Sequence, residues 1–251
     1  MVRRKRSSSV DLHDSKLLPL IHELKQTHPF WGYRRIWATL RYKHGLAVNH
    51  KRVHRILREQ NLLVNRKEYK AKRTGNRPKP KPSRPNEWWG IDMTKIMTGK
   101  GWAYLVIVLD WYTKKIVGYS LESQSRSKEW LEALDMGLNS QFPDGSRGKR
   151  LHLMSDNGCQ PTSVKFMSDC GILGVEQAFT SYNNPKGNAD TERMMRTIKE
   201  ELIWLNEYKD IWELKPAVKA WISSYNSDYL HSSLGWKTPE QFETETLLTY
   251  A

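Results

Sequence analysis

The sequence predicts a mixed α/β domain that follows a small all-helical domain. Up to about residue 65, apolar residues recur at helical spacing, and from Trp88 onward short strand-like runs alternate with helical segments. The charge divides the chain at the same place. Residues 1–86 hold 23 Lys and Arg against 5 Asp and Glu, whereas residues 87–251 hold 18 against 22. This asymmetry favours a polyanion-binding module over a merely solvated basic tail.

The composition excludes several classes of protein. The longest wholly apolar run, residues 105–109, cannot span a bilayer, and the first ten residues lack the apolar stretch of a signal peptide. Cys159 and Cys170 are the only cysteines, so neither a disulfide framework nor a four-cysteine zinc site is possible. We therefore expect a cytoplasmic protein with no membrane association.

The basic part divides into a tail over residues 1–13, a helix-turn-helix domain over 14–65 and a linker over 66–86. Three helices fit the periodicity, over residues 14–28, 31–45 and 48–61. Gly45 is a plausible stop and Asn49 a plausible N-cap for the third helix. Two amphipathic helices around a short turn, the second rich in Arg, are typical of a DNA reader, although a plain three-helix bundle is the alternative. The expected DNA contacts are Arg34, Arg35, Lys51, Arg52 and Arg55.

The linker holds nine Lys and Arg and four Pro in 21 residues. It has no apolar periodicity, and its Pro spacing favours an extended chain. Such a segment can also follow a phosphate backbone.

Residues 87–251 predict the RNase H-like fold, a mixed five-stranded sheet flanked by helices. The expected strands cover residues 87–97, 103–112, 114–123, 150–157 and 174–180. Helices are expected over 127–140 and 163–171, and a long one from about Asn188. We expect the fourth strand to pair beside the first.

Two aspartates lie where this sheet should gather them. Asp92 falls among apolar neighbours in "WGIDMTKI", where an unpaired charge would be costly. Asp156 ends the fourth strand in "SDNGCQ", where it either shapes a turn or faces a metal ion. Two Mg²⁺ ions acting on a phosphodiester require several carboxylates that converge from separate elements.

The third carboxylate should come from the helix that follows. Glu192, Arg196 and Lys199 form one row along it, bordering the apolar stripe. Glu192 can therefore look into a metal site, while Arg196 and Lys199 face a nucleic-acid backbone. Glu200 and Glu201 are better explained as residues of a solvated helix surface.

The spacing makes a resemblance definite, since 35 residues separate Asp156 from Glu192. Asp92, Asp156 and Glu192 resemble the DD(35)E triad of retroviral integrases and insertion-sequence transposases. "HPFWGYRRIWATLR" with "VNHKRVHRILRE" resembles the helix-turn-helix of the second-frame (OrfB) transposases. "LVIVLDWYTKKIVGYSL", "GNADTERMMRTIKEEL" and "YNSDYLHSSLGWKTPEQF" resemble further motifs of that family, so the match covers nearly the whole chain.

The resemblance implies a DNA transposase of bacterial origin that works at the nucleoid. Asp92, Asp156 and Glu192 would hold two Mg²⁺ ions, with Mn²⁺ as a substitute, and Lys199 would pair with a phosphate beside the scissile bond. One ion would activate water to cut the element's end, and the freed 3′-OH would attack another strand. The first attack would join the two element ends into a circle. The implied partners are double-stranded terminal repeats, target DNA and a second copy of the chain. Whether a product of the upstream frame is fused in the active form stays open at this point.

The chain departs from these families at two points. Tyr229 and Leu230 stand before His231, where the transposases commonly have Arg-Pro, so the contact of that Arg is in doubt. The zinc module of retroviral integrases is not expected, because no Cys precedes Cys159.

Two alternative functions remain open at this point. The first is a catalytically silent DNA-binding regulator derived from a transposase, against which the three intact carboxylates weigh. The second is a hybrid-cleaving nuclease, because Glu129 and Glu132 lie on a helix where ribonuclease H places a metal-binding Glu.

Overall fold

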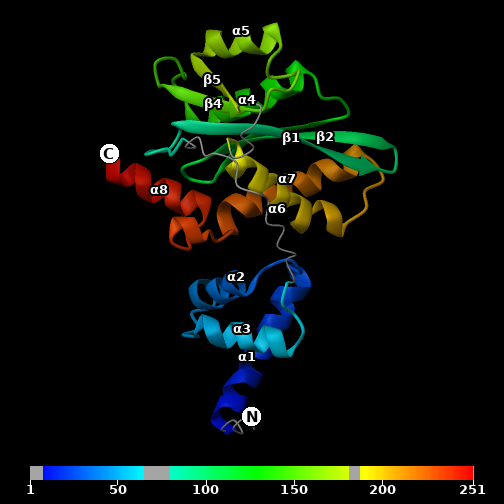
Figure 1. The fold of residues 1–251 in the computed structure, drawn as a ribbon, viewed down its shortest axis with the longest axis vertical. Helices are drawn as coiled ribbons and strands as arrows, with labels where there is room; N and C mark the ends of the chain where they lie inside the picture. Colours follow the sequence, from blue (N-terminus) through cyan, green and yellow to red (C-terminus); the bar gives the residue numbers. More distant parts are fainter. Residues whose placement is uncertain (1–7, 65–79, 181–186, 251) are drawn as a thin grey trace, which may run out of the picture. The chain divides into compact units, whose positions relative to one another are not determined.

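The computed structural model describes residues 8–64, 80–180 and 187–250 (Figure 1). Its contacts divide the chain into two compact units, residues 1–71 and 72–251. The expected basic tail up to residue 7 and most of the expected linker, residues 65–79, lie outside the described residues. None of the described helices is both long enough and apolar enough to cross a membrane.

In the N-terminal unit, the described residues 8–64 form three helices and one π-helical turn. They are α1 (Ser8–Thr27), α2 (Tyr33–Ala38), the π-helical turn η1 (Thr39–Lys43) and α3 (His50–Glu59). Their apolar faces bury Ile21, Ile36 and Val53 completely. The α3 start is as expected, because Asn49 accepts a hydrogen bond from the Lys51 backbone N–H (2.9 Å). Gly45, with φ of +66°, lies just after the second helix as expected.

One boundary of this unit differs from the sequence prediction. The helix α1 begins at Ser8, so residues 8–13 belong to a helix and not to the expected tail. The sequence reading placed the start at Asp14, a residue type that often caps helices. In the structure the Asp14 carboxylate is instead buried and engaged by arginines of α3.

The C-terminal unit is built on one five-stranded sheet in the order β3-β2-β1-β4-β5. Its strands are β1 (Trp88–Thr98), β2 (Gly101–Asp110), β3 (Ile116–Glu122), β4 (Leu151–Ser155) and β5 (Val175–Phe179). The strands β1, β2 and β3 pair antiparallel, while β4 runs parallel to both β1 and β5. The fourth strand therefore lies beside the first, and the predicted RNase H-like fold is confirmed.

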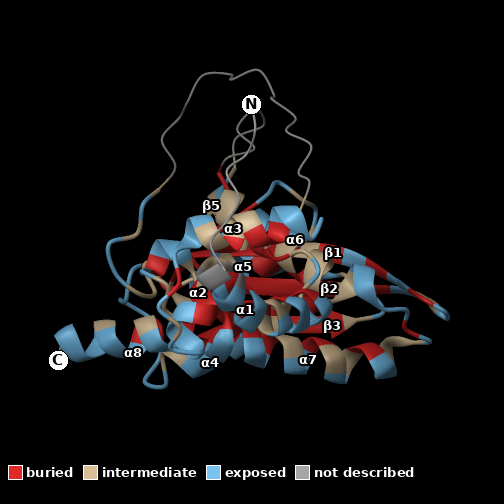
Figure 2. Ribbon diagram, turned by 90° about the horizontal axis from the view of Figure 1, so that it is seen from below, coloured by how far each residue is buried: buried red, intermediate tan, exposed pale blue. Residues whose placement is uncertain are grey.

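Helices cover both faces of this sheet, as Figure 1 shows. On one face lie α4 (Ser127–Gln141) and α5 (Val164–Leu173). On the other lie α6 (Ala189–Glu201), the 3₁₀ turn η2 (Ile203–Leu205), α7 (Ile211–Asp228), the 3₁₀ turn η3 (Ser232–Leu234) and α8 (Pro239–Tyr250). Buried residues gather on the strands in Figure 2. Trp89 and Ile91 of β1 pack against Trp130 of α4 and Phe166 of α5 in the main hydrophobic core.

Candidate active site

The pairing of β1 with β4 brings the two aspartates together. These strands are parallel, with Gly90 opposite Met154. The ladder ends at this pair, and Asp92 and Asp156 each follow it by two residues on the two neighbouring chain segments. Neighbouring strands lie about 4.8 Å apart, so both aspartates lie at the same end of the β1–β4 ladder.

The start of α6 lies against the same part of β1. The Asn188 side chain, at the N-cap of α6, donates a hydrogen bond from Nδ2 to the Ile91 carbonyl (3.2 Å). This bond holds the first turn of α6 against Ile91, which directly precedes Asp92 in the sequence. Because Glu192 lies in that first turn, α6 carries a third carboxylate to the two aspartates.

The electrostatics of Asp92 record this convergence. Burial raises the pKa of the Asp92 carboxyl to about 6, and the negative charges of Asp156 and Glu192 act in the same direction. A hydrogen bond from the Met93 backbone N–H and the positive charge of Lys199 act in the opposite direction. Residues from β1, from the end of β4 and from α6 therefore form one electrostatic cluster.

Asp156 also shapes the turn that follows β4. Its Oδ1 accepts a hydrogen bond from the Gly158 backbone N–H (3.0 Å), which closes an Asx turn. Asp156 itself is exposed at this turn. The turn fixes the orientation of the carboxylate, so shaping the turn and facing a shared site are compatible roles.

The cluster fits a hard divalent cation by its chemistry. All three side chains offer carboxylate oxygens, which are the ligands that Mg²⁺ and Mn²⁺ prefer. Burial is the main cause of the raised Asp92 pKa, and the negative charges of Asp156 and Glu192 add to it, so a bound cation would stabilise the ionised Asp92 carboxylate. As the side chains are placed, no group of three His, Cys, Asp or Glu within residues 8–64, 80–180 and 187–250 is close enough to chelate an ion. The structure therefore brings together the elements that carry the three carboxylates, and their charges act on one another, but the carboxylate oxygens do not surround a common point.

The raised Asp92 pKa predicts a pH-dependent cost to stability. The folded state binds the Asp92 proton more tightly than the unfolded state, where the pKa is near 3.8. The stabilising contribution is thus present below pH 3.8 and is lost as the pH rises through about 6. We expect Asp92→Asn to be more stable than the wild type near pH 7 by about 2 kcal/mol, with the gap closing near pH 4. Denaturant unfolding of both proteins at the two pH values measures this, and an equal gap at both would contradict it.

The two basic residues of α6 that were predicted to face DNA have different environments. Lys199 is half-buried, and its charge lowers the Asp92 pKa. Arg196 is exposed, and its Nε lies 2.7 Å from Glu200 Oε1 in a pair one turn apart. Lys199 is thus electrostatically linked to the carboxylates, whereas Arg196 has a carboxylate partner on its own helix.

The predicted DNA contacts on α3 fall into two groups. Arg52 Nε and Arg55 Nη2 each lie 2.7 Å from a carboxylate oxygen of Asp14, which is 8% exposed. These ion pairs tie α3 to α1 within the N-terminal unit. Lys51, by contrast, is exposed. Of the three, Lys51 is therefore the residue presented to solvent.

On α2, Arg34 is exposed and Arg35 is half-buried. The Arg34 guanidinium lies 5.7 Å from the ring centre of Tyr33, and the Arg35 guanidinium lies 5.6 Å from that of Trp31. Of these two arginines, Arg34 is the one better placed to contact DNA.

The structure gives Glu129 and Asp110 local roles. Glu129, 5% exposed, accepts hydrogen bonds from the Arg126 backbone N–H (2.7 Å) and side chain (3.1 Å) in a capping box. Asp110, at the end of β2, is fully buried and accepts hydrogen bonds from the Tyr112 backbone N–H (2.8 Å) and the Thr113 hydroxyl (3.0 Å). It shapes the turn between β2 and β3.

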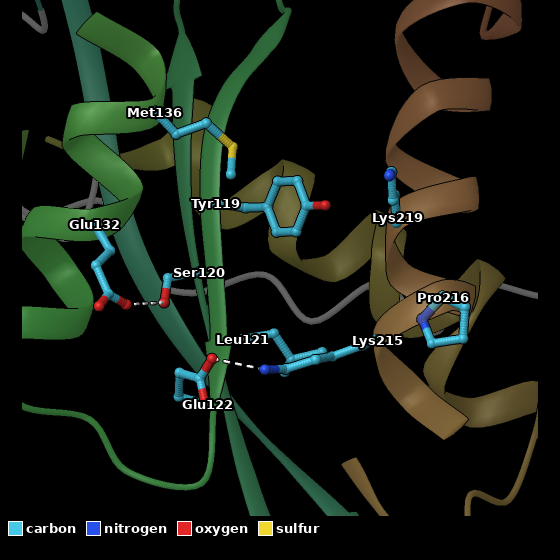
Figure 3. Close-up of a pocket in the computed structure, with 9 residues that line it drawn as sticks. All are labelled: Tyr119, Ser120, Leu121, Glu122, Glu132, Met136, Lys215, Pro216 and Lys219. Carbon is cyan, nitrogen blue, oxygen red and sulfur yellow. Dashed lines mark hydrogen bonds and ion pairs between the residues drawn. The ribbon is translucent and has the colours of Figure 1, made fainter. Parts of the chain in front are cut away.

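Glu132 faces a different part of the molecule. It lines a pocket at the edge strand β3, between α4 and α7, where the Ser120 hydroxyl lies 3.4 Å from its carboxylate (Figure 3). Lys215 of α7 binds Glu122 across the same pocket (2.7 Å). Asp92, Asp156 and Glu192 are not among the residues that line this pocket. The structure therefore offers no support for the hybrid-cleaving nuclease that Glu129 and Glu132 left open.

The C-terminal departure from the family motif has a visible consequence. Tyr229 is buried, and its hydroxyl donates a hydrogen bond to Glu201 at the end of α6 (3.0 Å). His231 packs against the Tyr229 ring. Here Tyr229 links the end of α7 to α6.

Comparison with known families gives the class of the protein. Two models described as "Integrase core domain" match residues 82–185 and 173–239, and a model described as "HTH-like domain" matches residues 13–70. Both integrase core matches lie within the C-terminal unit. Together with the transposase relatives described next, they identify the chain as a DDE-type polynucleotidyl transferase.

The curated relatives narrow this class to transposases. The chain is 29% identical to the transposase for insertion sequence element IS904 of Lactococcus lactis, over 93% of this chain and 94% of that protein. It is 28% identical to the putative transposase InsK for IS150 of Escherichia coli, over 87% and 79%. It is 27% identical to the transposase InsD for the IS2 elements, over 91% and 78%. The predicted resemblance to insertion-sequence transposases is confirmed.

Solved structures agree with the fold. A chain of the simian T-cell lymphotropic virus intasome, in complex with a PP2A regulatory subunit, superposes with a TM-score of 0.55 at 17% identity, over 92% of this chain and 74% of that one. The HTLV-2 integrase catalytic core domain in complex with magnesium gives 0.50 at 17% identity, over 65% and 99%.

Proposed function

We propose that this transposase binds the terminal repeats of an insertion sequence, cuts the DNA at the element ends and joins the freed 3′-OH to another strand. The observation that carries the proposal is the convergence of Asp92, Asp156 and Glu192 from β1, the end of β4 and the first turn of α6. Three carboxylates of this kind suit phosphodiester chemistry, which needs charge stabilisation more than a protein nucleophile.

Each carboxylate would contribute differently to the site. Asp92 is the half-buried oxygen donor from the rigid centre of the sheet, Asp156 is held by its turn, and Glu192 approaches on a helix. When bound, two Mg²⁺ ions, or Mn²⁺ in their place, would activate the attacking oxygen and stabilise the leaving one. The same residues would serve both steps, because an oxygen nucleophile attacks a phosphodiester in each, water in cutting and the 3′-OH in joining.

Lys199 is proposed to pair with a phosphate beside the scissile bond. Its ammonium offers only donors, so it cannot ligate a cation, but its charge already reaches Asp92. Lys199→Ala is expected to reduce cleavage of terminal DNA by about an order of magnitude or more, while thermal unfolding and the metal requirement stay unchanged. Arg193→Ala is the matched control, because Arg193 is an exposed basic residue of the same helix. Equal cleavage by the wild type and a folded Lys199→Ala protein would make this lysine a surface residue.

The N-terminal unit is proposed to recognise double-stranded terminal repeats, with Lys51 and Arg34 among its contacts. Arg52 and Arg55 would act mainly by holding α3 in place, since both pair with the buried Asp14. Pairing two DNA ends would require at least two copies of the chain. A DNA substrate of this kind lies in the bacterial nucleoid, so the proposed site of action is the cytoplasm.

The experiment that tests the function is cleavage of a labelled terminal repeat from the native element. We expect nicks at the element end that appear with Mg²⁺ or Mn²⁺ and vanish with a chelator. Tight, selective binding without metal-dependent nicking would instead identify a catalytically silent regulator.

A further inference from the structure

The first turn of α6 lies on β1 through an unusually close contact. A Cβ atom built on Gly90 would lie 1.9 Å from Thr191 Oγ1 and 2.4 Å from Trp111 Nε1. No real Cβ tolerates such distances, so only glycine at position 90 lets the helix approach the strand this closely. Gly90 lies two residues before Asp92 on the same face of β1.

A buried hydrogen bond fixes the helix in this place. Trp111 Nε1 donates to Thr191 Oγ1 (3.0 Å), and the two residues are 1% and 0% exposed. Trp111 lies directly after β2, and its backbone N–H donates to the Trp88 carbonyl at the start of β1 (3.0 Å). The bond therefore ties α6 to a part of the sheet that is itself held rigidly.

A third contact restrains the same turn from the side. Lys114 Nζ, in the turn between β2 and β3, lies 3.1 Å from Asp190 Oδ2. Asp190 and Thr191 directly precede Glu192, whose own side chain is exposed. The backbone position of Glu192 is therefore set by the contacts that hold these two neighbours.

We propose that Gly90, Trp111 and Thr191 are positioning residues that set the distance of the Glu192 carboxylate from Asp92. This inference rests on the proposed function, and it assigns a catalytic consequence to contacts that could otherwise only stabilise the fold. A displacement of about 1 Å in a site of this kind can cost about 100-fold in rate.

Three variants of the full chain separate positioning from stability. Gly90→Ala pushes α6 away from β1, Thr191→Val keeps the side-chain shape but removes the hydroxyl, and Thr191→Ser keeps the hydroxyl. Gly171→Ala is the matched glycine control, because a Cβ on Gly171 in α5 meets nothing within 4 Å. Each protein is measured for thermal unfolding with and without Mn²⁺, for binding of terminal repeats, and for cleavage against Mn²⁺ concentration.

We expect Gly90→Ala to bind DNA within about twofold of the wild type but to cleave it about 100-fold more slowly. Thr191→Val should require a higher Mn²⁺ concentration for half-maximal cleavage, and Thr191→Ser should restore the wild-type value. Both Gly90→Ala and Thr191→Val should lose part of the stabilisation by Mn²⁺ that the wild type and Gly171→Ala show.

A folded Gly90→Ala protein with wild-type cleavage and wild-type Mn²⁺ dependence would overturn the proposal. If Gly90→Ala does not fold, the comparison of Thr191→Val with Thr191→Ser tests the proposal instead. Equal Mn²⁺ dependence of cleavage in these two variants would overturn the proposal. Absence of cleavage by the wild type would sink the proposed function alone, because stabilisation by Mn²⁺ still reports on the position of Glu192. Absence of both in the wild type would overturn both.

Discussion

Asp92→Asn, Asp156→Asn and Glu192→Gln are each expected to abolish cutting and joining of terminal DNA while leaving DNA binding nearly unchanged. Each amide keeps the shape of the side chain but removes the negative charge that a divalent cation needs. Asp92 lies at the centre of the sheet, Asp156 in its turn and Glu192 on α6, so none of the three could replace another. We expect a loss of about three orders of magnitude or more, of the size seen when groups acting directly on transition-state charge are removed.

The matched control for this series is Glu200→Gln. Glu200 lies on the same helix as Glu192, and its carboxylate binds Arg196 (2.7 Å). This variant should cleave at nearly the wild-type rate, since an ion pair with a largely exposed arginine one turn away contributes little to stability. A Glu192→Gln protein that joins strands at a near-normal rate would remove Glu192 from the site.

Raising the salt concentration from 50 to 200 mM is expected to weaken binding of terminal repeats by about 1,000-fold or more. The first 86 residues hold 23 Lys and Arg, enough to neutralise many phosphates and release their counterions. Binding is best measured with the Asp92→Asn protein, which holds the DNA without cutting it. A salt dependence of only a few-fold would contradict the assignment of phosphate contacts to this part of the chain.

Single substitutions then distinguish contact with DNA from support of the domain. Lys51→Gln should weaken binding and reduce the salt dependence without changing thermal unfolding, because Lys51 is exposed. Arg52→Gln should lower the unfolding temperature of the N-terminal unit, because it leaves the buried Asp14 with one partner fewer. If Arg52→Gln weakened binding with no loss of stability, Arg52 would be a DNA contact, as the sequence alone predicted.

The sequence predicted the features of this protein that have a local or periodic signature. The strand around Asp92 is apolar, Asp156 ends an apolar run, and the sheet order follows from the succession of strands and helices. The placement of Asp156 beside Asp92 could be predicted because a βαβ connection returns the fourth strand parallel to the first. Glu192 followed from its row along an amphipathic helix.

The remaining features depend on contacts between distant residues. Trp111 and Thr191 are 80 positions apart, and Asp14 and Arg52 are 38 apart. Neither contact produces a periodic pattern in the sequence, so Arg52 could not be distinguished from the other basic residues of its helix. The need for glycine at position 90 likewise arises only when α6 lies against β1. A single glycine in a strand does not by itself predict that a helix packs closely against it.

The most direct test of the central claim is a joining reaction with pre-cut terminal repeats. One DNA ends in a 3′-OH and a matched DNA ends in a 3′-H. Each is incubated with target DNA and Mg²⁺ in the absence of nucleoside triphosphates. We expect a joined product from the 3′-OH end only, and none from either end with the Glu192→Gln protein. Equal joining of the 3′-H end, or no joining of the 3′-OH end by a wild-type protein that binds it, would contradict direct attack of the freed 3′-OH at the site of Asp92, Asp156 and Glu192.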